Sequence, residues 1–452
     1  MTQAAAFLDE PARRIPVDGE YDVVVLGGGP AGIAAAAAAA RQGCSTVLIE
    51  RYGFLGGMGT AAGVTNFCGL HANVHGDIRR VVHGITDDLL DRIDAYGGLN
   101  EPHLVLGKTK AQAYDTAAYK CAADDLLLAH GVAMRFHTLA AGVTLDSDTA
   151  LGALIVEDRS GRRAIRSRFF IDCSGDGDLA AFAGVPFEKG DDDGNLLYPT
   201  MMFRLAGVDA VKAGDAWSSI PDLMNEAEAR GVTFPRKGAI VRPQKHGSEW
   251  RVNVTQIKDD AGRAIDATDA AALSRGEIEG RQQAMAFFDF LRREAPGFAD
   301  AYVVDIPPQL GVRETRRITG RYQLTGEDVL TCASFDDTVG VNGWPLEKHV
   351  AGNVEWGWPP IPQSRGFNHL PYRMLVPDGP SNLLVAGRCA SMTHDGQSAA
   401  RVSGACFVMG EAAGTAAHLA LTRNATATQI DTNALQTLLR DNGVYLGLDE
   451  TN

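Results

Sequence analysis

The stretch YDVVVLGGGPAGIAAAAAAARQGCSTVLIE, residues 21–50, determines the architecture that we expect for the chain. Its apolar run at residues 21–26 predicts a buried strand, and the alanine-rich run at 33–43, which ends in glycine, predicts a helix. A second apolar run at 46–50 predicts another strand. A strand, a helix and a strand in this order form a β-α-β unit with parallel strands, so the sequence indicates an α/β fold.

Three glycines between the first strand and the helix have the spacing G-x-G-x-x-G, at Gly27, Gly29 and Gly32. The first permits a tight turn, the second lets the backbone approach a pyrophosphate, and the third allows close packing of helix and strand. The N-terminus of the helix offers free N–H groups and about half a positive charge to phosphates. Glu50 ends the second strand, where a carboxylate accepts a ribose hydroxyl. Together these features predict a dinucleotide site.

Two further segments indicate a dinucleotide longer than NAD. Gly56 and Gly57, in ERYGFLGGMGT, would let a loop lie along a pyrophosphate and a ribityl chain, for which a compact NAD site has no obvious use. Arg388 follows a predicted strand in NLLVAGRC and could neutralise a phosphate or stabilise negative charge on a reduced ring. The small-residue helix expected at residues 400–421 could face a flavin with its N-terminus, or its residues could be small only for tight packing.

The overall composition is that of a globular protein with a large core. The 452 residues carry a formal net charge of −14, and 45% of them are hydrophobic. An acidic balance argues against a nucleic-acid partner. The longest apolar run, residues 33–40, is too short to cross a bilayer, and the N-terminus lacks the apolar core of a secretory signal. We therefore expect a cytoplasmic protein with neither a membrane nor a nucleic-acid partner.

The cysteines and the remaining motifs argue against several kinds of site. Seven cysteines form no C-x-x-C pair, which fits reduced thiols and removes iron–sulfur clusters and a dithiol redox centre. No H-E-x-x-H, paired His/Cys ligand set or G-x-S-x-G occurs, so we expect no metal and no serine-hydrolase chemistry. Only one G-x-G-x-x-G follows a strand, so a second Rossmann site for NAD(P)H is not visible.

Five blocks of the chain resemble, in the same order, the FAD-dependent oxidoreductase family that also contains fumarate-reductase-like and HdrA-like flavoproteins. The blocks are residues 10–60, 170–184, 311–320, 369–377 and 382–414. The resemblance implies FAD as the cofactor and a Rossmann-like FAD-binding domain of the glutathione-reductase type, with an inserted α+β substrate domain. The iron–sulfur cysteines of HdrA-like members are absent, which argues against electron bifurcation with a partner.

The resemblance also implies a cofactor-binding role for the residues at matching positions. The glycines of the first motif would hold the pyrophosphate and Glu50 the adenosine ribose. The residues that would run beside the ribityl chain and ring are Gly56, Gly57, Met58 and Thr60. Many related flavoproteins have Gly-Asp where this chain has Gly387-Arg388, and an arginine cannot accept hydrogen bonds from ribityl hydroxyls. The full set is Gly27, Gly29, Pro30, Ala31, Gly32, Glu50, Arg51, Gly56, Gly57, Met58, Thr60, Leu139, Ser174, Gly175, Asp178, Gly387 and Arg388.

The blocks divide the chain into an FAD-binding domain and two insertions. The stretch from about residue 190 to 363 is more polar and richer in Trp and Pro than its flanks. We therefore expect an FAD-binding domain at 1–75, 111–190 and 370–452, a helical insertion at 76–110, and a substrate or cap domain at 191–369.

Hydride transfer requires a proton donor or acceptor near the reacting carbon. Candidates lie in two segments where the two domains should meet, HLPYR at residues 369–373 and THDGQSAAR at 393–401. We expect His394 to be the acid or base, with His369 as the second candidate and Tyr372 as a weaker proton relay. Either histidine could instead satisfy backbone groups in a loop.

Arginines near the same junction could bind an anionic group. Arg313, Arg373 and Arg401 could form a clamp for a carboxylate, and arginines act in this way in fumarate-reductase-like relatives. Arg204 could also reach the site, or it could be a surface residue of an edge strand. The tryptophans of the segment 344–358 could line a substrate pocket or form a capping loop.

We therefore expect an FAD-dependent enzyme that oxidises a C–OH or C–N bond of a small polar molecule by hydride transfer to flavin. Two alternatives stay open. One is reduction or desaturation of a C–C bond, as in fumarate-reductase-like flavoproteins. The other is a flavin-bearing electron carrier for a protein partner, which has no substrate of its own. The sequence leaves the formation of a homo-oligomer open.

Overall fold

The computed structural model describes residue 8 and residues 10–450 of the chain. The prediction that the N-terminus lacks a secretory signal falls partly on residues 1–7 and 9, outside the described residues. The expected FAD-binding domain includes these residues and residues 451–452, to which the same applies. Strand β1 begins at Val17, before the predicted start at residue 21.

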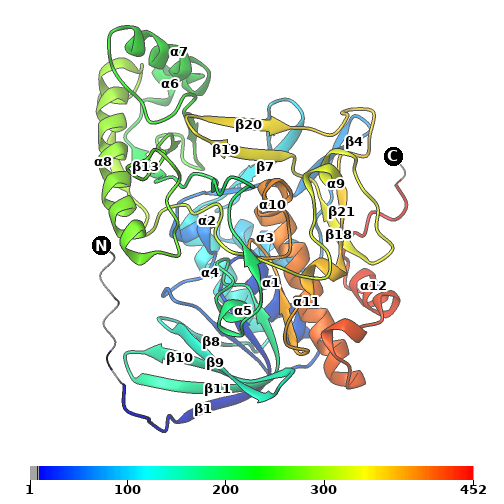
Figure 1. Ribbon diagram of the computed structural model, residues 1–452. Coiled ribbons are helices and arrows are strands. Elements are labelled where there is room, and N and C mark those ends of the chain that lie inside the picture. The colour runs from blue at the N-terminus through cyan, green and yellow to red at the C-terminus, as the bar shows by residue number, and fades with distance from the viewer. Residues whose placement is uncertain (1–7, 9, 451–452) are drawn as a thin grey trace.

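The main sheet has seven strands in the order β8-β2-β1-β11-β10-β9, with β22 beside the C-terminal end of β11. Strands β1 and β8–β11 of this sheet are labelled in the lower part of Figure 1. The strands β8, β2, β1, β11 and β22 run parallel, whereas β9, β10 and β11 form an antiparallel meander. The expected α/β fold with a parallel Rossmann-like sheet is therefore confirmed. The strand bounds are β1 (Val17–Leu26), β2 (Thr46–Ile49), β8 (Ala133–Arg135), β9 (Leu139–Ser147), β10 (Ala150–Asp158), β11 (Gly161–Asp172) and β22 (Leu383–Val385).

Helices α1 (Pro30–Arg41) and α11 (Ser403–Arg423) pack against each other at very short range. A Cβ atom at Gly410 or Gly414 would overlap the carbonyl oxygen of Ala31 or Ala35, so only glycine permits this approach. Helix α11 begins later than predicted. Its start follows a break after α10 (His394–Ala400), and the break positions two residues that line a cavity described below.

The Gly414→Ala variant should be less stable than the parent by about 1–3 kcal/mol, the usual cost of overpacking a core. Alanine has the higher helix propensity, so propensity alone predicts stabilisation by about 1 kcal/mol. Urea unfolding measures the difference. Thr422→Ala, on the exposed side of the same helix, is the control and should change stability by less than about 0.5 kcal/mol. A Gly414→Ala protein at least as stable as the parent would contradict the close packing.

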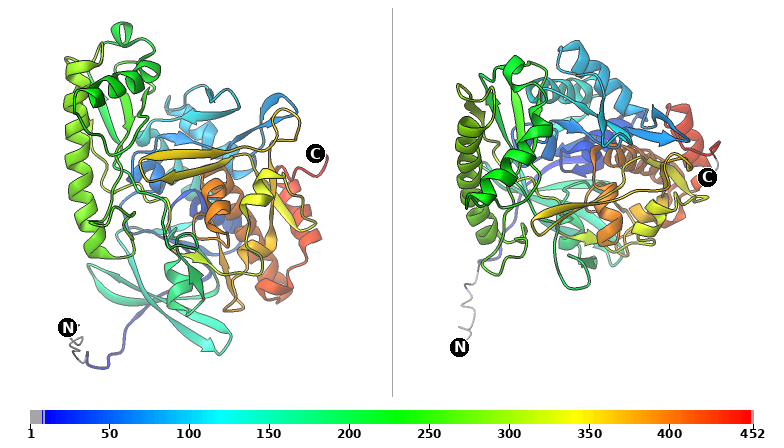
Figure 2. Two further views of the ribbon diagram at one scale, coloured as in Figure 1. Left: turned by 45° about the horizontal axis from the view of Figure 1, so that its top comes forward. Right: turned by 90° about the horizontal axis from the view of Figure 1, so that it is seen from above.

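The inserted segment has a hydrophobic core of its own, formed by residues from Met201 to Val312. Its four-stranded antiparallel sheet has the order β14-β15-β13-β16, and Figure 2 shows α8 along the outer side of this unit in both views. The elements are β13 (Phe203–Ala206), α6 (Ala210–Ala213), α7 (Ala216–Ala229), β14 (Ile240–Pro243), β15 (Trp250–Asn253), α8 (Ala270–Glu294) and β16 (Tyr302–Asp305).

Two segments differ from the expected division of the chain. Residues 76–110 contain a single helix, α3 (Ile85–Ala95), between short strands, so this insertion is not mainly helical. Residues 318–369 were expected in the substrate domain, but Ile318, Leu324 and Phe367 pack into the main core. The inserted core therefore ends well before residue 369.

The other elements are short and surround the cavity and the main core. They are α2 (Met58–Ala61), β3 (Asn66–Phe67), β4 (His71–Val74), β5 (Asp77–Arg80), β6 (His103–Val105), β7 (Thr109–Ala113), α4 (Thr116–Ala129), α5 (Asp178–Phe182), β12 (Phe187–Glu188), β17 (Arg317–Ile318), α9 (Gly326–Leu330), β18 (Thr338–Asn342), β19 (Leu346–Val350), β20 (Asn353–Gly357), β21 (Asn368–Pro371), η1 (Tyr372–Leu375), η2 (Ala427–Gln429) and α12 (Thr432–Asp441). None of the helices within residues 8 and 10–450 has both the length and the apolarity needed to cross a bilayer.

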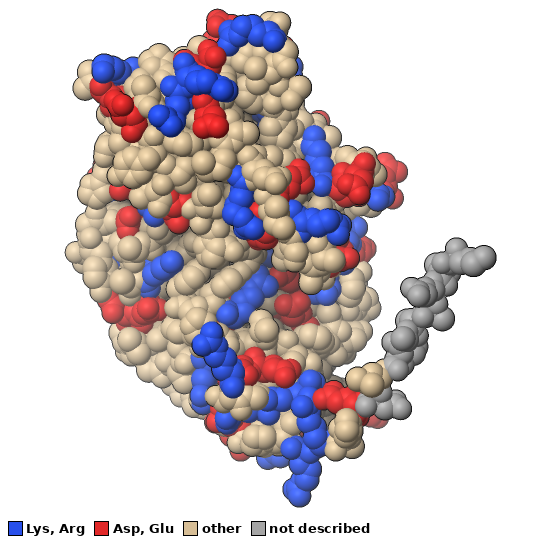
Figure 3. All heavy atoms as spheres, turned by 90° about the vertical axis from the view of Figure 1, so that its left-hand side faces the viewer, with Lys and Arg blue, Asp and Glu red and all other residues tan. Residues whose placement is uncertain are grey.

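The surface on the α8 side carries charges of both signs. Figure 3 faces this side and shows groups of Lys and Arg side chains next to groups of Asp and Glu, with broad areas of other residues between them. All seven cysteines are free thiols, as expected.

Candidate functional site

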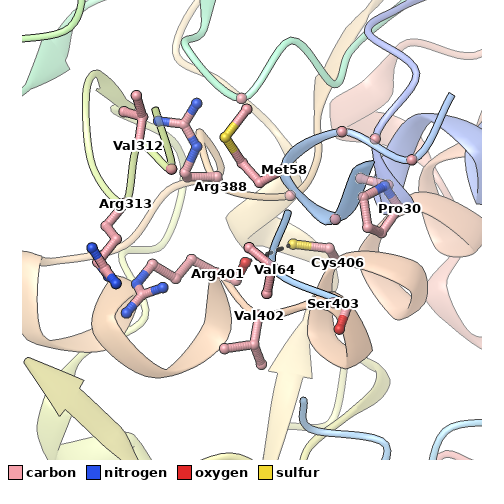
Figure 4. Close-up of a pocket in the computed structure, with 18 of the residues that line it drawn as sticks. Pro30, Met58, Val64, Val312, Arg313, Arg388, Arg401, Val402, Ser403 and Cys406 are labelled. Atoms are coloured by element: carbon pink, nitrogen blue, oxygen red, sulfur yellow. Dashed lines mark hydrogen bonds between the residues drawn. The ribbon is translucent and has the colours of Figure 1, made fainter. Parts of the chain in front are cut away.

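A cavity of about 330 Å³ extends from the C-terminal ends of the central parallel strands to the inserted sheet. Its volume lies within the range of about 300–1,000 Å³ that is usual for small-molecule sites. The wall comes from the two glycine-rich loops, from the ends of β11 and β22, from the break between α10 and α11, and from the inserted sheet with the β19–β20 hairpin. Figure 4 shows part of this wall, with Pro30 and Met58 on one side and Arg313 and Arg401 on another.

The first glycine loop has three glycines with different roles. Gly27 has a φ of +100°, and a Cβ atom there would overlap the carbonyl oxygen of Cys173. A Cβ atom at Gly32 would overlap the carbonyl oxygen of Gly27. At Gly29, by contrast, a Cβ atom would meet only the Cα atom of Gly57 at 3.7 Å, an ordinary contact. The protein's own packing therefore does not require glycine at position 29, and the space beside it belongs to the cavity.

The second glycine loop lies directly against the first. The Gly56 N–H donates to the carbonyl oxygen of Gly28 at 2.8 Å, and a Cβ atom at Gly57 would lie 2.8 Å from the Cα atom of Gly29. We call residues 27–30 and 56–58 together the glycine cradle. It combines the N-terminus of α1 with side-chain-free backbone, which fits a pyrophosphate.

Glu50 lies beside the glycine cradle and lines the cavity. One carboxylate oxygen accepts from the Gly28 N–H at 2.6 Å and the other from the Tyr52 N–H at 2.9 Å. Burial raises its pKa. A carboxylate has about four acceptor positions, so two backbone bonds leave capacity for a ribose hydroxyl. The residues present therefore fit the adenosine half of a dinucleotide.

Arg388 is held by a buried carboxylate that our sequence analysis did not include. Asp176 accepts from Arg388 at 2.8 Å and lies 3.3 Å from Arg51. Burial raises the pKa of Asp176, but Arg388 and Arg51 outweigh burial and leave it below the ordinary value. Asp176 lies between the predicted site residues Gly175 and Asp178, and this position was the signal that could have identified it.

Most of the predicted cofactor residues line the cavity. The exceptions are Gly32, which packs α1 against β1, and Thr60, whose hydroxyl donates to the carbonyl oxygen of Leu55 at 2.7 Å. The lining residues are Gly27, Gly29, Pro30, Ala31, Glu50, Arg51, Gly56, Gly57, Met58, Leu139, Ser174, Gly175, Asp178, Gly387 and Arg388.

Four of the six predicted catalytic residues are not among the residues that line the cavity, and each has another partner. Nδ1 of His394 lies 2.9 Å from the buried Glu314 carboxylate. His369 accepts from the Phe335 N–H and lies 3.2 Å from the carbonyl oxygen of Gly447. The Tyr372 hydroxyl donates to the carbonyl oxygen of Ala427 at 2.8 Å, and Arg373 is partly exposed beside Asp337. Only Arg313 and Arg401 of this set line the cavity.

Arginines gather in the part of the cavity next to the inserted sheet. Arg242 and Arg251 join Arg313 and Arg401 in its wall, and none of these four has an ion pair within the described part of the chain. Burial lowers the pKa of Arg251 to about 10 and that of Arg313 well below its usual value. Figure 4 shows Arg313 and Arg401 next to each other. Buried guanidinium groups that have no carboxylate within ion-pair distance favour an anionic ligand.

A carboxylate and an imidazole lie among these arginines. Glu347 accepts from the Trp344 indole N–H at 2.9 Å, and its other oxygen lies 3.1 Å from Nε2 of His349. Burial alone would raise the pKa of Glu347, but His349 and Arg401 lower it to about 2. Burial keeps the pKa of His349 well below its ordinary value, so the ring is neutral. We call Arg242, Arg251, Arg313, Arg401, Glu347 and His349 together the arginine chamber.

Sequence reasoning missed Arg242, Arg251, Glu347 and His349. The only local signal was the alternation of Glu347 and His349, which places both side chains on one face of β19. Of the tryptophans considered, Trp344 and Trp356 line the cavity. Arg204 does not line it and pairs with Glu249 and Asp305.

Comparison with known proteins gives one family match. The family model described as FAD dependent oxidoreductase matches residues 22–439. A search of curated proteins finds no match.

Several solved structures are similar at low identity. A geranylgeranyl bacteriochlorophyll reductase-like protein from Thermoplasma acidophilum is 13% identical, with 95% of this chain and 94% of that chain covered and a TM-score of 0.47. A p-nitrophenol 4-monooxygenase from Pseudomonas putida is 13% identical, with 96% and 87% covered and a TM-score of 0.46. A flavin-dependent brominase is 15% identical, with 93% and 83% covered and a TM-score of 0.47. Likenesses of this degree carry no inference about substrate or reaction.

Proposed function

The chain belongs to the FAD-dependent oxidoreductase family, and from this premise we propose that it oxidises a C–OH or C–N bond in a small anionic molecule. The observation that supports the proposal is the arginine chamber, which is continuous with the glycine cradle in one cavity. The glycine cradle, Glu50 and Arg388 would hold FAD. The chemistry that FAD supplies when bound is acceptance of a hydride from a substrate carbon.

Arg313 and Arg401 are the groups that we expect to bind the anionic group of the substrate. Arg313 donates to the carbonyl oxygen of Tyr198 at 2.6 Å, and Arg401 to that of Glu347 at 3.2 Å. These bonds orient the two guanidinium groups and leave most of their five donors each free. Two adjacent guanidinium groups can bind a carboxylate in a defined orientation, which would direct the neighbouring carbon toward the cofactor.

His349 is the proton acceptor in this proposal. Its Nε2 faces Glu347, and no described residue bonds its Nδ1, although the residue lines the cavity. A neutral imidazole whose Nε2–H donates to a carboxylate has a lone pair at Nδ1. Nδ1 would accept the proton of the substrate hydroxyl or amine while the C–H bond breaks. Glu347 would stabilise the resulting imidazolium.

Anaerobic titration of the purified yellow protein tests the proposal. Glycolate, lactate and alanine should bleach the flavin absorbance about tenfold faster or more than ethylene glycol, propylene glycol and isopropylamine, their analogues without a carboxylate. A charge-assisted bond to the missing carboxylate contributes about 1.5–3 kcal/mol, and about 1.4 kcal/mol corresponds to tenfold in rate. Equal reduction by the compounds with and without a carboxylate would contradict an anionic substrate.

The same protein distinguishes the two alternatives. If none of the compounds reduces the flavin but crotonate rapidly re-oxidises the dithionite-reduced protein, the reaction is reduction of a C–C bond. The carrier alternative predicts no room for a substrate beside the cofactor. The extension of the cavity beyond the glycine cradle into the arginine chamber argues against it.

A further inference from the structure

Arg242 and Arg251 face each other across two strands of the inserted sheet. They are direct partners in the antiparallel pairing of β14 with β15, and both line the cavity. Cβ atoms of directly opposed residues lie about 4.5–5.5 Å apart, and two like charges there destabilise the sheet. A compensating charge, either from the protein or from a ligand, relieves this repulsion.

The protein supplies that charge to a neighbouring arginine but not to these two. Arg204, which pairs with Arg251 in the register of β13 with β15, has Asp305 at 3.3 Å and Glu249 at 3.8 Å. Among the described residues, Arg242 and Arg251 have no carboxylate within 4.0 Å. Arg242 instead lies over the ring of Trp217 at 4.6 Å.

Arg251 is the more deeply buried of the pair, with 4% of its surface exposed. Its Nη1 contacts only the sulfur of Met202 at 3.5 Å, and its Nε has no partner. Its Nη2 reaches the amide oxygen of Asn66 at 3.0 Å once that amide is turned. Glu347, which acts on Arg251 from a greater distance, already bonds Trp344 and His349. A buried guanidinium with these weak partners has capacity for an anion.

We propose that Arg242 and Arg251 form a second anion-binding subsite, which takes an anionic group at the end of the substrate remote from the reacting carbon. The substrate then carries two anionic groups, the first at Arg313 and Arg401 and the second on the inserted sheet. The second group is a carboxylate or a phosphate. This inference rests on the proposed function, because it assigns the first anionic group to Arg313 and Arg401.

Equilibrium binding to the FAD-loaded protein tests the subsite without turnover. The probes are glutarate against butyrate and phosphoglycolate against glycolate, at constant ionic strength, followed by the perturbation of flavin absorbance and by the shift in melting temperature. The parent should bind at least one doubly anionic probe about tenfold more tightly than its singly anionic analogue. The preferred probe of the two identifies the second group as a carboxylate or a phosphate.

Substitutions should show which arginines cause the preference for doubly anionic probes. Arg251→Gln and Arg242→Gln should each reduce it to about threefold or less while binding of butyrate or glycolate changes little. Arg251→Lys, which keeps the charge, should retain part of the preference. Arg204→Gln is the matched control, because it removes an arginine of the same sheet that does not line the cavity, and it should keep the full preference.

Two outcomes would overturn the subsite: no preference for either doubly anionic probe in the parent, or an undiminished preference in both Gln variants. The proposed function can fail or stand independently of the subsite. Arginine-dependent binding of a doubly anionic probe in a protein whose flavin no hydroxy or amino acid reduces would leave the subsite standing and reject the oxidation. If such acids reduce the flavin but the protein has no preference for doubly anionic probes, the proposed oxidation would stand and the subsite would be rejected.

Discussion

The Gly29→Ala variant is expected to fold like the parent and to bind FAD about tenfold more weakly or worse. Gly29 has a φ of −76° and a ψ of −176°, a conformation that alanine adopts without strain. The added methyl group would meet only Gly57 at 3.7 Å within the protein, but it would enter the glycine cradle. If displacement of the pyrophosphate costs about 1.4 kcal/mol of binding free energy, the affinity for FAD falls tenfold. Fluorescence titration of apoprotein with FAD measures the loss.

Gly32→Ala is the matched comparison for this prediction. Its methyl group would overlap the carbonyl oxygen of Gly27, so we expect a lower melting temperature with or without FAD. The two variants should therefore separate cofactor binding from folding within a single motif. Unchanged FAD affinity in a well-folded Gly29→Ala protein would show that the pyrophosphate lies elsewhere.

The His349→Gln variant should slow reduction of the flavin by about 100-fold or more, the usual contribution of a positioned general base. FAD affinity should be unchanged, because His349 lies in the arginine chamber rather than in the glycine cradle. Stopped-flow mixing of the anaerobic enzyme with the most effective acid of the panel measures the rate. His394→Gln is the control, since His394 bonds Glu314 and does not line the cavity, and its rate should stay within about threefold of the parent.

The pH dependence of the same step gives a second readout. Only the neutral form of His349 can accept a proton, and burial lowers its pKa in the folded protein below the ordinary 6.5. The active form therefore persists as the pH falls to about 6.5, and the rate should be nearly constant between about pH 8 and 6.5. A rate that halves near pH 6.5 in the parent would contradict His349 as the base.

The nucleotide-binding half of the fold could be predicted from the sequence because its signals are local. The strand, the glycines, the helix and Glu50 lie within 30 consecutive residues, and each has a specific backbone requirement. The parallel pairing of β1 with β2 follows from the same segment. The contact between Gly29 and Gly57 was also foreseeable in outline, since both loops were expected along one pyrophosphate.

The arginine chamber could not be predicted in this way because its members are far apart in the chain. Arg242 and Arg251 enter it through a sheet register, Arg401 through the break between two helices, and His349 through a hairpin strand. Our preference for His394 and His369 rested on their position in two segments where the two domains were expected to meet. The pairing of β21 with β18 instead directs His369 toward Phe335 and Gly447.

The separate hydrophobic core of the inserted segment has a consequence for how such a protein can diversify. Residues from Met201 to Val312 pack mainly among themselves, whereas the pyrophosphate loops belong to the other core. We therefore expect substitutions at Arg242, Arg251 or their neighbours to alter which compounds are bound without weakening the binding of the prosthetic group. Laboratory evolution confined to this unit should yield new substrate selectivities while the part of the chain that binds the prosthetic group stays unchanged.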